Sequence, residues 1–151
     1  MMEINDIKNH INNKSRLIGV DMGSKRVGLS ISDENRKIAI PLKTINYLSI
    51  QILIDELKRL SNENNVHAII FGNPKNMDGT EGSSSQSVKD KVKLINEKIE
   101  IPTFFWDERL STVGAFNLSS QLDVNVSKRL KKIDENAATF ILQGFLDYLN
   151  N

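Results

Sequence analysis

The chain has 151 residues, with 20 lysines and arginines against 19 aspartates and glutamates, so its formal net charge is only +1. This length fits one compact domain with its own buried core. No cysteine is present, which excludes disulfides, thiolate metal sites and a cysteine nucleophile. The apolar runs are too short to span a membrane and no secretory signal region opens the chain, so we expect a cytoplasmic protein without a membrane partner.

The first predicted elements are short strands joined by turns. A short apolar run indicates a strand over 17–21, alternating apolar residues indicate one over 26–32, and a third passes through Ile38 and Ile40. The first strand ends on the carboxylate of Asp21, and Pro41 is expected near the end of the third. The turns between the strands are short, which favours an antiparallel meander.

Helices and strands alternate in the rest of the chain. Ser49 is a plausible cap for a helix whose apolar side carries Leu48, Ile52, Leu53, Leu57 and Leu60. A strand over 66–71, a polar loop over 72–87 and a helix with Val88, Val92, Ile95 and Ile99 follow. The remaining predictions are a strand over 101–106, a helix from near Ser111 or Thr112, and a last helix from about Asp134 with Ala137, Phe140, Ile141 and Phe145 on one side.

This order of elements predicts an α/β fold. Three strands in a meander, followed by α-β-α-β-α, imply a mixed five-stranded sheet, antiparallel first and then parallel, with helices on both faces. Periodicity alone leaves a flavodoxin-like fold open, but the early meander favours an RNase H-like fold. We expect a tail or short helix over residues 1–15 and a single RNase H-like nuclease domain over 16–151.

Four acidic residues are candidates for catalysis. Asp21 follows a buried strand, where sites form at a sheet edge, although it could also cap the turn that follows. Asp107 and Glu108 end another strand and fit equally well as a solvated exit before a helix. Asp134 is explained as readily by a helix N-terminus. If the last helix packs across the centre of the sheet, these acids converge at one edge.

Converging carboxylates favour a hard divalent cation. Mg²⁺ or Mn²⁺ takes oxygen ligands and retains several waters, which suits one or two carboxylates per ion together with a substrate phosphate. Two such ions about 3.5–4 Å apart would hold the attacking and leaving oxygens of a phosphoryl displacement. The pattern therefore indicates metal-assisted phosphodiester hydrolysis.

Basic and polar residues near these acids are candidate substrate contacts. They are Lys25, Arg26, Asn73, Lys75, Asn76, Arg109 and Thr112. An exposed connection explains the loop residues among them nearly as well. A second basic cluster, Lys128, Arg129, Lys131 and Lys132, taken alone favours a solvated helix end or loop.

Four motifs in a fixed order resemble one known family. They are Gly19 to Gly28, Gly72 to Glu81, Asp107 to Thr112, and Ile133 to Gln143. The chain from about Arg16 to Leu149 resembles the YqgF/RuvX family of pre-16S rRNA nucleases, which are related to Holliday junction resolvases. Ser111 stands where the family usually has threonine, and this change retains the hydroxyl.

The resemblance implies an RNase H-like fold and an RNA substrate, precursor 16S rRNA, whose 5′ end is trimmed either free or within the pre-ribosomal small subunit. It implies a catalytic set of Asp21, one acid of the Asp107–Glu108 pair, and Asp134. In the related resolvases the second acid follows the fourth strand, but here that strand ends in Gly72-Asn73-Pro74. The second acid must then come from the fifth strand. We favour Glu108, so that Asp21, Glu108 and Asp134 are the expected metal ligands.

Three other functions remain open. Asp21-Met22-Gly23-Ser24 also resembles the first phosphate loop of actin-like ATPases and sugar kinases, but the second half that those proteins need is missing. A non-catalytic RNA-binding or transcription-associated module would gain nothing from carboxylates that face phosphate. The third is a resolvase-like endonuclease on branched DNA.

Overall fold

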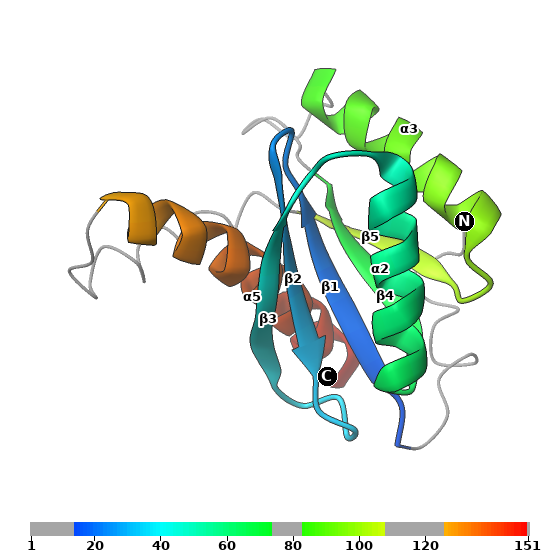
Figure 1. Ribbon diagram of the computed structural model, residues 1–151. Helices are drawn as coiled ribbons and strands as arrows, with labels where there is room; N and C mark the ends of the chain where they lie inside the picture. Colours follow the sequence, from blue (N-terminus) through cyan, green and yellow to red (C-terminus); the bar gives the residue numbers. More distant parts are fainter. Residues whose placement is uncertain (1–13, 74–82, 108–125, 151) are drawn as a thin grey trace.

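The computed structural model describes residues 14–73, 83–107 and 126–150, and the side chains within 14–73, 86–106 and 137–150. The strands are β1 (Arg16–Met22), β2 (Arg26–Ser32), β3 (Ala39–Asn46), β4 (Val66–Asn73) and β5 (Thr103–Asp107). The described helices are α2 (Ile50–Glu63), α3 (Ser83–Lys98) and α5 (Val126–Asn150). They form three layers, with the sheet between α2 and α3 on one side and α5 on the other (Figure 1).

The sheet confirms the predicted topology. Its strand order is β3-β2-β1-β4-β5. The pairs β1–β2 and β2–β3 are antiparallel, whereas β1–β4 and β4–β5 are parallel. Because β1, β4 and β5 run in the same direction, their last residues, Met22, Asn73 and Asp107, lie at one edge of the sheet. We call this edge the carboxyl edge.

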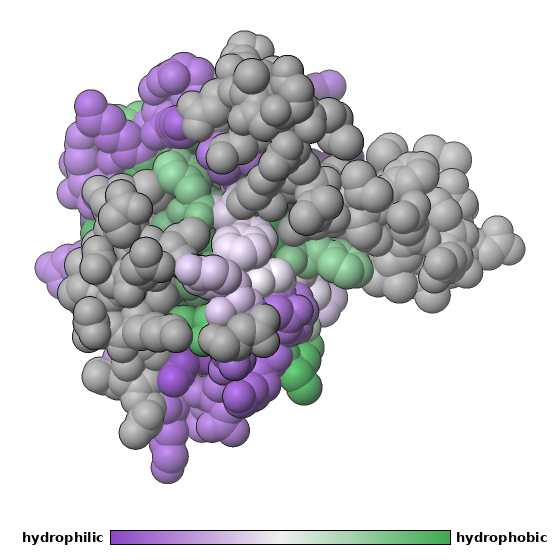
Figure 2. Space-filling view, turned by 180° about the vertical axis from the view of Figure 1, so that it is seen from behind, coloured by the Kyte–Doolittle hydropathy of each residue, from purple (hydrophilic) through white to green (hydrophobic). Residues whose placement is uncertain are grey.

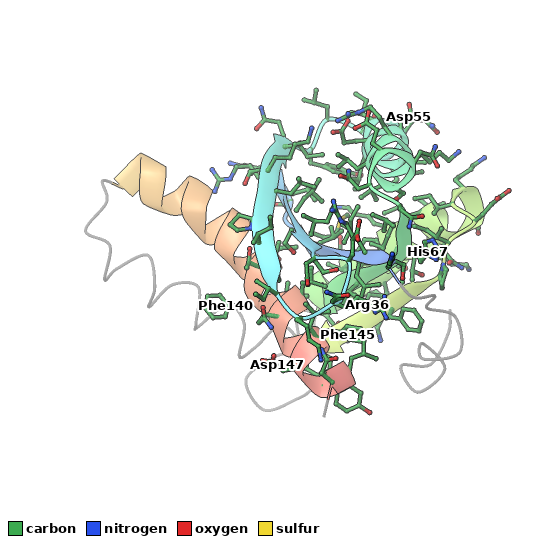
Figure 3. All side chains as sticks on the ribbon, turned by 90° about the horizontal axis from the view of Figure 1, so that it is seen from below. Arg36, Asp55, His67, Phe140, Phe145 and Asp147 are labelled. Carbon is green, nitrogen blue, oxygen red and sulfur yellow. The ribbon has the colours of Figure 1, made fainter. Side chains whose placement is uncertain are left out.

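Each face of the sheet has its own apolar core. Even-numbered residues of β1, such as Ile18 and Val20, pack with the helices α2 and α3. Leu17 of the same strand packs with Phe104 and Phe145 on the α5 face. Figure 3 shows Phe145 directed from α5 toward the sheet, and Asp55 on the outer side of α2. This alternation is the period of two expected for a strand that is covered on both faces.

The start of α2 was predicted correctly, and its apolar face was predicted in part: Leu53, Leu57 and Leu60 are buried, whereas Leu48 and Ile52 are not. Ser49 is the N-cap, and its hydroxyl accepts a hydrogen bond of 3.2 Å from the Ile52 amide. Leu48 precedes the cap and is 75% exposed, and Ile52 is 48% exposed. Because the helix begins at Ile50, the buried face is formed instead by Leu53, Ile54, Leu57, Leu60 and Ser61.

The third strand is displaced from its prediction. It starts at Ala39, after Ile38, and runs to Asn46, so Pro41 lies near its beginning. A proline is tolerated there because β3 is an edge strand and the missing N–H breaks no central ladder. Ile38 belongs to the preceding turn, where its amide and that of Lys37 donate to Asp33 Oδ1. These bonds, the one from Ile38 first, lower the pKa of Asp33.

Two helices begin earlier than the apolar periodicity indicated. The helix α3 begins at Ser83, inside the predicted loop, and α5 begins at Val126 rather than near Asp134. The first turn of α3 is polar, and in α5 Val126 is followed by three polar or basic residues, so neither turn carries the apolar stripe that marks a helix. Residues 1–13 of the tail or short helix predicted over 1–15, and the helix predicted near Ser111, lie outside the described residues. None of the helices in the described ranges is long and apolar enough to cross a membrane.

Candidate active site

Asp21 lies at the carboxyl edge, on the face of the sheet that α5 covers. It is half-buried and pairs with Gly28 of β2. Leu17 belongs to the α5 core, and a side chain added at Gly19 would contact Ala138 and Leu142 of α5. Since residues two apart on a strand share a face, Asp21 belongs to this face as well.

A backbone hydrogen bond closes the turn after β1. The Gly23 amide donates to the Arg26 carbonyl over 2.9 Å. A Cβ at position 23 would lie 2.3 Å from that carbonyl oxygen, so only glycine fits there. Within the described residues the Asp21 carboxylate takes no part in closing this turn, which argues against the turn-capping alternative. The turn places Lys25 in solvent and leaves Arg26 half-buried.

The strand β4 separates Asp21 from the end of β5. Val20 pairs with Phe71, and one step further along β4, Gly72 and Asn73 pair with Trp106 and Asp107. The Asp107 backbone therefore lies at the same sheet edge as Asp21. Asn73, a predicted substrate contact, is only 6% exposed, so most of its surface is packed against the protein.

The helix α5 crosses β1 unusually closely at Gly19. The Ser30 hydroxyl, beside Gly19 on β2, donates to the Ala138 carbonyl over 2.7 Å. An added Cβ at Gly19 would lie 2.5 Å from Ser30 Oγ, 2.7 Å from Leu142 Cβ and 2.9 Å from the Ala138 oxygen. Ala138 comes one helical turn after Asp134, which is well inside α5. The helix-cap explanation of Asp134 is therefore wrong.

We expect Gly19→Ala to destabilise the fold by about 1–3 kcal/mol, because overpacking at a close crossing forces strand and helix apart. Chemical denaturation of the variant beside wild type measures this change. The variant Ala68→Gly provides a contrast, because Ala68 of the neighbouring strand β4 is also buried on the α5 face. That substitution removes a methyl group instead of adding one. A Gly19→Ala variant as stable as wild type would contradict the close crossing.

The aromatic residues at the end of β5 belong to the core, as predicted. Trp106 packs edge-on against Phe145, with ring centroids 5.9 Å apart, and lies 5.7 Å from the ring of Tyr148. Phe105 packs on the opposite face with the α2–α3 core. Neither ring is therefore a free platform for a nucleic-acid base.

Several predicted site residues are not placed by the structure. Among the described side chains, no three histidines or acids are grouped closely enough to hold a metal ion. Asp21 is the only candidate metal ligand among those side chains. Outside the described residues or side chains lie Lys75, Asn76, Asp107, Glu108, Arg109, Thr112, Asp134 and the basic cluster over 128–132. Figure 2, which views the molecule from behind, draws the residues outside the described ranges in grey.

Sequence reasoning did not identify Gly19 as a residue that positions the site. Its place inside a buried apolar strand was a usable signal, because a glycine there often marks a close approach of another backbone.

The sequence of the chain matches one family along most of its length. The profile of the RuvX family, described as Holliday junction resolvase, matches residues 15–148. A protein of Pelagibacter ubique (strain HTCC1062), which carries the provisional name pre-16S rRNA nuclease, is 60% identical over 151 residues and covers 100% of both chains. The chain belongs to the RuvX family.

A second RuvX-family relative and two solved structures agree with this assignment. A Sinorhizobium medicae (strain WSM419) protein with the same provisional name is 42% identical over 131 residues, covering 87% of this chain and 79% of its own. RuvC of Thermus thermophilus in complex with a Holliday junction substrate has a TM-score of 0.56 at 12% identity, over 91% of this chain and 97% of its own. The yeast mitochondrial Holliday junction resolvase has a TM-score of 0.54 at 15% identity, and the match covers 97% of this chain and 84% of the resolvase chain. These structures confirm the RNase H-like fold.

Proposed function

We propose that this chain is a cytoplasmic nuclease that hydrolyses phosphodiester bonds of precursor 16S rRNA and so helps to form its 5′ end. The observation that carries the proposal is the position of Asp21. Its carboxylate is half-buried at the carboxyl edge, on the face crossed by α5. Among the described residues it has no cationic partner. The names of the family relatives supply the RNA substrate.

The proposed catalytic acids are Asp21, Glu108 and Asp134. The even-numbered residues of β5, Phe104 and Trp106, belong to the α5 face, which is also the face of Asp21. This alternation supports Glu108 over Asp107 as the second acid. Asp134 precedes Ala138 by four residues and Leu142 by eight, which is the spacing of one helical stripe. That stripe is the one that meets Gly19.

A hard divalent cation fits these donors. A half-buried carboxylate without a protein cation retains charge for a metal, and three carboxylates supply the oxygen ligands that Mg²⁺ and Mn²⁺ prefer. We propose Asp21, Glu108 and Asp134 as the residues that hold it. When bound, the metal would supply Lewis-acid stabilisation of the charge on the reacting phosphate.

The side chains around the acids would hold the RNA backbone. Lys25 is exposed on the turn that directly follows β1, and Arg26 is half-buried beside it. Their charges would attract phosphate independently of base sequence. Lys75, Asn76, Arg109 and Thr112 are proposed as further substrate contacts, and the basic residues over 128–132 as backbone contacts.

The test is to incubate the purified protein with a 16S rRNA fragment that carries its 5′ extension. We expect the extension to be shortened with Mg²⁺ or Mn²⁺ and to remain intact in EDTA. Equal shortening with and without chelator would indicate a contaminating, metal-independent nuclease. RNA binding without cleavage under every metal condition would favour the non-catalytic module.

A second candidate function is cleavage of branched DNA. The description of the family and the two resolvase structures favour it. The same assay with a four-way DNA junction separates the two functions. Preferential cleavage of the junction at equal substrate concentration would replace precursor RNA as the substrate.

A further inference from the structure

Tyr47 lies at the carboxyl edge although it is distant in sequence from the candidate acids. It follows β3, whose last residue, Asn46, pairs with Arg26 at the start of β2. The Tyr47 amide donates to the Lys25 carbonyl over 2.8 Å. One hydrogen bond thus joins Tyr47 to the turn that begins directly after Asp21 and Met22.

A lysine of α3 lies over the ring of Tyr47. The Lys91 ammonium is 4.5 Å from the ring centroid. The same ring is half-buried against the α2–α3 core, so its position is fixed by packing. The helix α3 begins at Ser83, after the end of β4, so its first turns lie near the carboxyl edge, and Lys91 follows at the middle of the helix (Figure 1).

The charges of Lys25 and Lys91 remain available for a ligand. Elsewhere in the described structure the cations Lys43 and Arg59 are neutralised by Glu56 and Glu63. Within the described ranges neither Lys25 nor Lys91 has such a carboxylate partner. The partner of Lys91 is an aromatic face, which leaves its positive charge uncompensated.

An apolar side chain completes this arrangement. Leu48 directly follows Tyr47 and is 75% exposed. An exposed apolar group beside a fixed aromatic ring and two uncompensated cations has the composition of a single-strand binding site. Such sites combine a positive track for the backbone with aromatic surfaces on which bases stack.

We propose that Lys25, Tyr47, Leu48 and Lys91 form a binding surface for single-stranded RNA next to the candidate active site. We call these four residues the Tyr47 surface. Lys25 and Lys91 contact phosphates, while Leu48 and the part of Tyr47 that the core and Lys91 leave exposed contact one base. Asp21 faces α5 and Tyr47 faces α2 and α3, so the bound strand crosses the carboxyl edge over the turn that carries Lys25. The Tyr47 surface therefore holds the segment of the precursor that extends away from the catalytic acids. This inference rests on the proposed function.

The test measures RNA binding and not cleavage. The parent protein carries Asp21→Asn, the buffer contains EDTA, and the ligand is a single-stranded RNA with the sequence of the 5′ extension. Lys91→Gln should weaken binding and reduce the slope of log K against log salt concentration by about 0.7, the value for one lost phosphate contact on a single strand. Lys98→Gln is the matched control, because Lys98 is exposed at the far end of the same helix.

The aromatic contribution is tested with two further substitutions in the same parent. Tyr47→Leu should weaken binding about 10-fold, because it removes the ring that contacts the base and over which Lys91 lies. Tyr47→Phe retains the ring and should bind as the parent does. Thermal unfolding shows whether each variant is folded. If Tyr47→Leu does not fold, Lys91→Gln against Lys98→Gln still decides the proposal.

The outcomes separate this inference from the proposed function. If the parent binds RNA and the salt slopes of Lys91→Gln and Lys98→Gln are equal, the Tyr47 surface is overturned. The nuclease proposal is then left intact. A parent that does not bind the RNA at all would overturn the Tyr47 surface, and the cleavage assay with metal would still decide the nuclease proposal. A loss of slope in Lys91→Gln alone would support the surface.

Discussion

Asp21→Asn should lower the rate of RNA cleavage by roughly 10³-fold, which corresponds to about 4 kcal/mol of lost transition-state stabilisation. The substitution retains the size of the side chain and removes the charge that a hard cation requires. The measurement is kcat/KM for shortening of the 5′-extended precursor, at saturating Mg²⁺ and again at saturating Mn²⁺. Both metals are used because a weakened site can be filled again by a metal that binds more tightly.

Stability provides the internal control for this variant. Asp21 is half-buried without a cationic partner among the described residues, so the neutral amide should leave the folded state as stable as before or more stable. Asp55→Asn makes the same chemical change on the outer side of α2, where Asp55 only accepts a hydrogen bond from Gln51. We expect Asp55→Asn to cleave RNA like wild type. Cleavage by Asp21→Asn at the wild-type rate would place the chemistry elsewhere.

The order of strands and helices was predictable because each buried segment shows its own period. The strands predicted over 17–21 and 26–32 required no correction beyond one residue at an end, since the first is a short apolar run and the second has apolar residues that alternate with small ones. The beginnings of α3 and α5 were not predictable in this way. The turn that begins at Ser83 is polar, and the one that begins at Val126 is polar or basic after its first residue, so neither carries an apolar period.

The candidate site was predictable only in part, for a similar reason. Asp21 was visible because a carboxylate rarely follows a buried strand without a function. The roles of Gly19 and Tyr47 depend on contacts with residues far along the chain, Ala138 for the glycine and Lys91 for the tyrosine. A glycine inside a buried strand signals a close approach without naming its partner, and the contact of Tyr47 leaves no mark in the local sequence.

The two acids at the end of β5 should differ strongly in their effect on cleavage. We expect Glu108→Gln to reduce kcat/KM by roughly 10³-fold, as Asp21→Asn does, and Asp107→Asn to reduce it by less than about 10-fold. Strand alternation provides the reason. Phe104 and Trp106 share the α5 face with Asp21, whereas Phe105 packs on the opposite face.

The opposite face of β5 packs on α3, which strengthens the expected difference between Asp107→Asn and Glu108→Gln. The Thr103 hydroxyl donates to Asn96 of α3 over 3.1 Å, so the odd-numbered positions of this strand are directed to the helices and away from Asp21. Asp107 is an odd-numbered position and Glu108 an even-numbered one. A large loss in Asp107→Asn with normal cleavage by Glu108→Gln would mean that the alternation breaks at the end of β5. The second metal ligand would then be Asp107.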